Sequence, residues 1–151
     1  MGARRNPRQP LTSGVWTGDW ADASQLSAVE KTQIEMSDVL SFHNYSAPGD
    51  FEKHVRELQV YHRPILCTEY MARGFQSTFE GILPIAKKYK VAAINWGLVA
   101  GKTQTWLPWD SWAKPYVNRE PAVWHHEVFH TDGTPYRKEE VDFVRKIMRT
   151  N

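Results

Sequence analysis

The chain has 151 residues, of which 41% are hydrophobic and 24% are charged, and its net charge is +2. These ordinary globular values exclude a disordered or low-complexity chain, and so small a charge gives no reason to expect a nucleic-acid partner. No stretch approaches the roughly 18 apolar residues of a membrane span, and no apolar signal segment follows the basic residues 1–8. We therefore expect a soluble protein without a membrane partner, whose compartment stays open.

The first half of the chain predicts two strand–helix units. Residues 10–16 form the first predicted strand, and a weak helical pattern follows over residues 26–36. The second predicted strand covers residues 38–45, because it is rich in residues that fit a pleated sheet. Apolar side chains then recur at i, i+4 and i+7 over residues 51–58, which predicts a helix behind an Asp50 cap.

The second half predicts two further units of the same kind. The third strand covers residues 63–69. A helix is predicted over residues 78–89, and Pro84 should kink it or mark a late start, because proline cannot donate the backbone hydrogen bond. The fourth strand covers residues 91–99, and an amphipathic helix over residues 138–148 ends the pattern.

Four alternations of apolar strand and helix indicate an α/β fold with parallel strands and both sheet faces covered. A complete (β/α)8 barrel needs about 250 residues, so this chain can hold only half of a TIM barrel. We predict one domain over residues 1–151, with residues 1–9 as the remnant of a preceding helix and residues 10–151 as four βα units. An open doubly wound sheet is the alternative, although the sequence has no glycine-rich nucleotide-binding loop. The single cysteine, Cys67, excludes an internal disulfide and is expected to be a buried hydrophobe.

Polar and aromatic residues gather where the predicted strands end. His43 and Tyr45 end the second strand, Glu69 ends the third, and Trp96 lies near the end of the fourth. In an α/β barrel this rim carries the catalytic groups, because it is open to substrate and rigidly supported. A carboxylate, a phenol that orients it and a flat indole are suited to a retaining glycosidase. An ordinary carboxylate that caps the next helix is the alternative role for Glu69.

Three runs of sequence resemble the last strands of cellulase-like and β-galactosidase-like retaining glycoside hydrolases with a (β/α)8 barrel. They are Pro-Ile-Leu-Cys-Thr-Glu-Tyr-Met-Ala-Arg (64–73), Ala-Ile-Asn-Trp-Gly-Leu-Val-Ala-Gly-Lys-Thr-Gln-Thr (93–105) and Asp-Gly-Thr-Pro-Tyr (132–136). The resemblance extends over nearly the whole chain, which would supply strands five to eight. It implies that Glu69 is the nucleophile, that Tyr45 hydrogen-bonds its carboxylate beside His43, and that Trp96 forms the floor of the sugar subsite. Lys102, which lies in the second run, is also expected to bind substrate.

Two further tryptophans are expected to contact substrate. Trp106 and Trp109, with Trp112 after them, recur in a region that contains proline and glycine, where a hydrophobic core has no use for them. Loop tryptophans of this kind suit the faces of sugar rings. The alternative is that a long loop packs on its own aromatic side chains.

The sequence departs from the family at the acid/base residue. The family carries an Asn-Glu-Pro motif at the end of strand four, and this chain begins after that point. The run Asn-Arg-Glu-Pro at 118–121 has an extra residue and no preceding strand. General acid catalysis is worth roughly 10²- to 10⁴-fold, so we expect at most trace hydrolysis of a β-linked glycan by this chain alone. No cofactor and no metal are expected.

Two alternative functions belong to other classes. The first is a barrel fragment that binds carbohydrate without hydrolysing it, or is merely structural. The second is a zinc peptidase, because His126, Glu127 and His130 fit H-E-x-x-H on a predicted helix after Pro121. That chemistry needs a third protein ligand, and Tyr136 stands where the longer motif has histidine.

A half barrel also predicts an oligomer. Four parallel strands would leave two unpaired edges and an uncovered apolar inner face, which favour association. The simplest solution is a homodimer in which two copies close a four-plus-four barrel.

Overall fold

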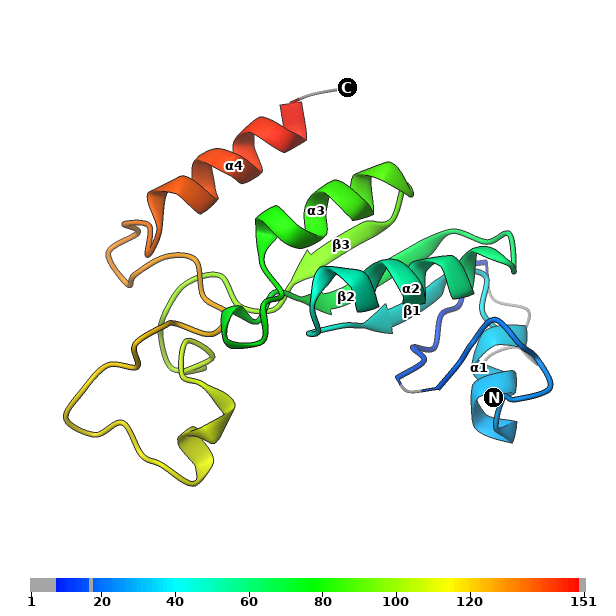
Figure 1. Cartoon of the computed structure of the whole chain (residues 1–151), viewed down its shortest axis with the longest axis horizontal. Helices are drawn as coiled ribbons and strands as arrows, with labels where there is room; N and C mark the ends of the chain where they lie inside the picture. The colour runs from blue at the N-terminus through cyan, green and yellow to red at the C-terminus, as the bar shows by residue number, and fades with distance from the viewer. Residues whose placement is uncertain (1–7, 17, 150–151) are drawn as a thin grey trace.

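The computed structural model describes residues 8–16 and 18–149, and Figure 1 traces them in colour. Three strands form a parallel sheet in chain order: β1 (Leu40–His43), β2 (Ile65–Tyr70) and β3 (Ala92–Asn95). Each strand lies within a segment predicted to be one, apart from Tyr70, one residue beyond. The predicted α/β class with parallel strands is confirmed.

Four α-helices alternate with these strands: α1 (Ala28–Glu35), α2 (Pro48–Gln59), α3 (Phe79–Lys88) and α4 (Lys138–Arg149). Ser27 caps α1 in a capping box with Glu30, and the Thr78 hydroxyl caps α3 by accepting from Gly81 N. Two short 3₁₀ helices, η2 (Arg73–Phe75) and η3 (Trp109–Trp112), lie in the loops. None of the helices in the described part of the chain has the length and apolarity of a membrane span.

One predicted helix start was wrong, and the late start considered for another helix did not occur. The helix α2 begins at Pro48, three residues before the predicted start, and its N-cap is Ala47 rather than Asp50. Proline suits the first position of a helix, where no backbone donor is needed. The helix α3 begins at Phe79, so Pro84 does not delay it. Burial of Phe79 and Ile82 keeps the helix together despite the proline in its interior.

The first predicted strand is reduced to a single parallel bridge between Val15 and Phe42 of β1. Val15 N donates to Ser41 O at 2.9 Å, but Ser13 N donates to the Ser37 hydroxyl at 3.0 Å instead of to a strand. Side-chain hydrogen bonds thus replace part of the regular ladder. Residues 1–7 of the expected helical remnant lie outside the described residues, and residues 8 and 9 form a bend.

The two faces of the sheet differ sharply. The helices α2 and α3 lie over one face, where Phe42, Phe51 and Cys67 are fully buried (Figure 1). On the other face Ile94 is 51% exposed, and beyond the strand ends Trp96 is 46% exposed. The described residues thus contain three strands that alternate with helices, and the face opposite α2 and α3 is exposed at Ile94 but buried at Ser41 of β1.

A long irregular segment joins β3 to α4 and extends beyond the carboxyl ends of the strands (Figure 1). Isolated bridges from Phe129 to Val99 and to Pro135 hold its two ends together. The helix predicted after Pro121 is wrong, because residues 121–130 form bends and extended backbone. Their backbone groups form hydrogen bonds with other loop segments instead of within a helix. His125 N, for example, donates to Trp106 O.

Candidate functional site

The carboxylate of Glu69 lies at the carboxyl end of the sheet. Glu69 is the penultimate residue of β2, and its register partner on β1 is His43. The Tyr45 hydroxyl donates to Glu69 Oε2 at 2.5 Å, and His43 Nδ1 lies 3.2 Å from the same oxygen. The Glu69 side chain is 21% exposed. One carboxylate oxygen is therefore held by two neighbours while the group remains open to solvent.

Burial raises the pKa of Tyr45, and the hydrogen bond to Glu69 and its negative charge raise it further. The phenol therefore keeps its proton and acts as a donor at neutral pH. A fixed donor on one oxygen orients the carboxylate, which is what a nucleophile needs if it is to meet a carbon atom from a defined direction.

Aromatic rings lie on two sides of this carboxylate. The Trp16 ring meets His43 edge-on with centroids 5.4 Å apart, and the Trp109 ring meets Tyr45 edge-on at 5.2 Å. Trp109 remains 39% exposed. An exposed indole beside a carboxylate offers a flat apolar surface and an acceptor together, which suits a sugar ring with its hydroxyls.

Trp96 follows β3 at the same edge of the sheet, because the preceding Asn95 pairs with Tyr70. Gly97 then turns the chain with a φ of +93°, where a Cβ would stand 2.9 Å from the Thr105 hydroxyl oxygen. Thr105 in turn donates to the buried carboxylate of Glu127 at 2.5 Å. Glycine is therefore required at position 97, and the loop behind Trp96 is fixed by hydrogen bonds.

The sequence-predicted substrate residues are only partly brought together. His43, Tyr45, Glu69 and Trp109 form one contact cluster, with Trp96 at the same sheet edge. Trp106 packs against Trp124 with centroids 5.5 Å apart, which matches the alternative of local loop packing. Lys102 is exposed in the loop after β3. No contact among the described residues joins Lys102 to Glu69.

The H-E-x-x-H residues do not form a metal site. Because residues 121–130 are not helical, the two histidines lose the i, i+4 geometry that the motif requires. His126 Nδ1 lies 2.7 Å from Met71 O, and the His130 ring packs against Trp124 at 4.5 Å. Within residues 8–16 and 18–149, no three His, Cys, Asp or Glu side chains are grouped to hold a metal.

A buried layer behind the site was missed from the sequence. His126 lies 5.3 Å from the Tyr45 ring, and Trp109 rests on His125 at 4.9 Å. Beside them, Arg73 forms a buried ion pair with Glu140. These residues come from segments far apart in the sequence, and no spacing pattern marks them. They fix the aromatic rings that face Glu69.

His125 should make the protein less stable in mild acid. It is 2% exposed, and its Nε2 has no hydrogen-bond partner among the described residues. Burial, followed by the charges of His126 and Arg73, lowers the pKa of His125 to about 4 from an ordinary value of 6.5. Between these two pH values the unfolded chain binds a proton that the folded chain does not. Stability is therefore complete above pH 6.5 and falls as the pH drops toward 4, by about 2–3 kcal/mol.

Urea unfolding at pH 7.5 and pH 4.5 measures this loss. The variant His125→Phe keeps the ring and removes the titration, so its stability should fall less over the same interval. His62→Asn replaces an exposed histidine, and asparagine tolerates the positive φ of 52° at that position. It should behave like the natural protein, and an equal loss in all three proteins would contradict the role of His125.

No known protein-family model matches the chain, and no curated protein sequence matches it significantly. The chemistry of the site therefore rests on its geometry.

Proposed function

We propose that the chain is the nucleophile-bearing half of a retaining glycoside hydrolase barrel, with a β-linked glycan as its ligand and Glu69 as the nucleophile. The observation that carries the proposal is the double contact on Glu69 Oε2, from Tyr45 at 2.5 Å and His43 at 3.2 Å, at the carboxyl edge of a parallel sheet. Retaining glycosidases use such an oriented carboxylate to attack the anomeric carbon.

The same geometry favours weak hydrolytic activity of this chain on its own. A retaining mechanism needs a second carboxyl group about 5–5.5 Å from the nucleophile, which protonates the leaving oxygen. The first candidates for this second carboxyl group are Asp19 and Asp110, but both accept hydrogen bonds from residues close to them in sequence. Asp19 Oδ1 accepts from Ala21 N at 3.3 Å, and Asp110 Oδ1 accepts from the Tyr116 hydroxyl at 3.1 Å. We therefore infer that the isolated chain binds glycan and hydrolyses it at most in traces.

Binding of carbohydrate without catalysis is the second candidate function. The exposure of Trp96 and Trp109 favours it, because both indoles can receive a sugar face whether or not an acid/base group is supplied. The two functions differ in whether Glu69 acts chemically, and they share the prediction of binding.

Replacing Trp96 by alanine should raise the dissociation constant for a bound oligosaccharide at least about tenfold, since tryptophan contacts at binding sites often contribute more than 1 kcal/mol. Calorimetric titration with β-linked cello-, xylo- and manno-oligosaccharides of four to six units measures this. Val60→Ala is the control, because Val60 is 49% exposed after the end of α2, at the end of the sheet opposite Glu69, and should leave binding unchanged. If none of these glycans binds the natural chain, the proposal is wrong.

A further inference from the structure

A hollow opens beside Trp109, which belongs to the Glu69 contact cluster. It encloses about 360 Å³, within the range of about 300–1,000 Å³ that is typical of small-ligand sites. Its lining comes from three parts of the chain, which are η2, η3 with the loop after it, and residues 121–125. Trp109 belongs to both places, because it lines the hollow and its ring also meets the Tyr45 ring at 5.2 Å. The hollow therefore continues outward from the carboxylate of Glu69.

Aromatic rings form a continuous surface that leads into this hollow. The Trp109 and Phe75 rings lie 4.8 Å apart with an angle of 36° between their planes, so they form one wall. Phe75 is 50% exposed, and Trp109 is exposed as well. The buried His125 ring meets both of them edge-on, at 4.9 Å from Trp109 and 5.6 Å from Phe75. Exposed rings that a buried neighbour supports offer a flat apolar surface, and little side-chain entropy is lost when a ligand covers them.

The segment that carries Phe75 is firmly attached to the protein. Phe75 ends η2, whose first residue, Arg73, forms the buried ion pair with Glu140. Arg73 N also donates to His125 O at 3.1 Å. Between them, Gly74 lies so close to His125 that a Cβ would stand 3.2 Å from Cε1 of the imidazole. This wall of the hollow is therefore formed before a ligand arrives, as in most small-ligand sites.

A carboxylate with spare hydrogen-bonding capacity lies beside these rings. Asp110 and Tyr116 both line the hollow, and the Asp110 side chain is 43% exposed. The Tyr116 hydroxyl donates to Asp110 Oδ1 at 3.1 Å, and Lys114 Nζ lies 3.5 Å from Oδ2. A carboxylate can accept about four hydrogen bonds, and a phenol oxygen can accept as well. Hydroxyl groups of a ligand therefore meet acceptors next to an apolar ring surface.

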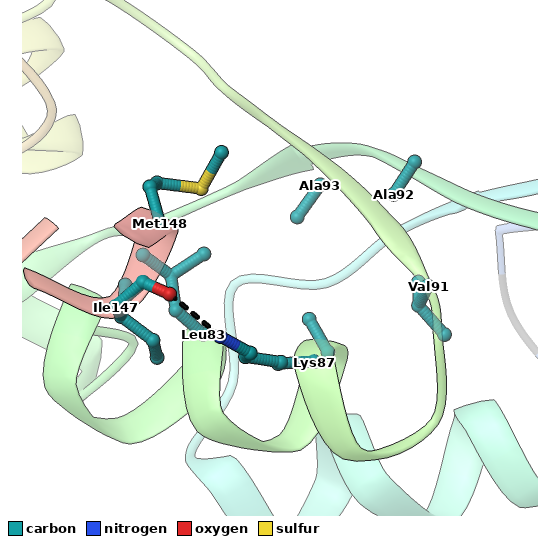
Figure 2. A pocket seen from close by; sticks show the side chains of 8 residues that line it. Leu83, Lys87, Val91, Ala92, Ala93, Ile147 and Met148 are labelled. Carbon is teal, nitrogen blue, oxygen red and sulfur yellow. Dashed lines mark hydrogen bonds between the residues drawn. The ribbon is translucent and has the colours of Figure 1, made fainter. Parts of the chain in front are cut away.

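The aromatic hollow differs in kind from a groove at the opposite end of β3, which Figure 2 shows between α3, the chain leading into β3 and the end of α4. Aliphatic side chains such as Leu83 and Val91 line that groove, and its charged residue, Lys87, donates to Ile147 O at 2.8 Å. Among the described residues, neither an aromatic ring nor a carboxylate lines it. A ligand with flat apolar faces and many hydroxyls therefore suits the aromatic hollow better than this groove.

We infer that the aromatic hollow is a second sugar subsite, which binds the glycan unit next to the one at Glu69. The inference rests on the proposed function, and it adds that the ligand is a chain of β-linked sugars rather than a single glycoside. A pyranose ring has apolar faces and hydroxyls at its edge. One face can stack on Phe75 while the hydroxyls reach Asp110. Trp109 then lies between the two subsites and contacts both units.

Titrations with glycans of one and of four units test this assignment. The probes are methyl β-glycosides of glucose, xylose and mannose, the corresponding β-linked tetrasaccharides, and an aryl β-glycoside, with binding measured by calorimetry and NMR. In the series that binds, the tetrasaccharide should have a dissociation constant at least about tenfold below that of the methyl glycoside, because the second subsite adds contacts.

Two variants separate the second subsite from the first. Phe75→Ala should raise the dissociation constant of the tetrasaccharide about fivefold or more, since it removes an apolar ring that the ligand covers. Asp110→Ala should raise it about tenfold, because a charged acceptor is lost. Neither should change the binding of the methyl glycoside. Met148→Ala is the control, because Met148 is 75% exposed in the groove of Figure 2 and should change neither dissociation constant.

The possible results distinguish the second subsite from the proposed function. A tetrasaccharide that binds no tighter than its methyl glycoside would overturn the subsite and leave binding at Glu69 intact. Unchanged tetrasaccharide binding in both Phe75→Ala and Asp110→Ala would have the same meaning. If Phe75→Ala weakens only the aryl glycoside, the hollow takes an aromatic group and the inference is wrong. If no glycan binds the natural chain, the proposed function fails, and the second subsite fails with it.

Discussion

Replacing Glu140 by glutamine should lower the free energy of unfolding by about 3–5 kcal/mol. Arg73 and Glu140 are 1% and 4% exposed, and Arg73 Nε donates to Glu140 Oε1 at 2.8 Å. The substitution keeps the shape of the side chain and leaves the guanidinium charge buried without a counterion. Desolvation of that charge is then offset by the carbonyl oxygens of Trp124 and Glu127, which accept from Arg73 Nη1 at 3.1 and 3.0 Å, and by the Tyr136 ring, whose centroid lies 5.0 Å from Arg73 Cζ.

The neighbouring residue provides the control for this measurement. Glu139→Gln changes charge by the same amount in the same first turn of α4, but its side chain is exposed, so stability should change by less than about 0.5 kcal/mol. Chemical denaturation of both variants at pH 7 gives the comparison. Equal effects would mean that the ion pair contributes nothing beyond the general charge of α4.

On the proposed function, co-expression with a complementary half of a barrel should give hydrolysis. The partner would be four βα units from a retaining barrel glycosidase that carries Asn-Glu-Pro after its fourth strand, co-expressed with this chain. With an acid/base group in place, turnover of an aryl β-glycoside should rise roughly 10²- to 10⁴-fold above that of the chain alone. The released sugar should keep its anomeric configuration, because Glu69 would form a covalent intermediate.

Glu69→Gln in the complemented barrel should remove this activity on the order of 10³-fold or more, since a neutral amide cannot act as the nucleophile. Glu120→Gln is the control, because Glu120 belongs to the Asn-Arg-Glu-Pro run, is exposed, and should be irrelevant. Activity that survives Glu69→Gln would refute the assignment. A well-folded complex without activity would count against the glycosidase function and leave carbohydrate binding as the remaining candidate.

The sequence predicted the elements whose side chains follow a strict period. Phe51, Val55 and Leu58 recur at helical spacing and are all buried in α2, and the three apolar runs around Phe42, Cys67 and Ala93 became the parallel sheet. Local pattern alone decides such elements, because one face must be buried. The first predicted strand is only partly formed, because Ser13 N donates to the Ser37 hydroxyl and the Thr12 hydroxyl donates to that of Ser41. No periodic pattern in the sequence predicts these hydrogen bonds.

The site was predictable only where its residues end adjacent strands. The contact from Tyr45 to Glu69 is present as the resemblance implied, while the catalytic roles of both residues stay predictions. The segment after Pro121 was misjudged, because its histidines suggested a helix that lacks the capping and apolar periodicity to form. The layer of His125, His126 and Arg73 depends on hydrogen bonds across more than 50 residues, and such contacts leave no local signal.

The ion pair between Arg73 and Glu140 also sets the order in which the molecule can be assembled. Its partners are 67 residues apart, so the pair cannot form during synthesis until the first turn of α4 has left the ribosome. The sheet and α1 to α3 are local units that can form earlier. The loop carbonyls of Trp124 and Glu127, which share the same guanidinium, are then fixed in the same late event. The rim around Glu69 thus takes its final form last, when the C-terminal helix docks.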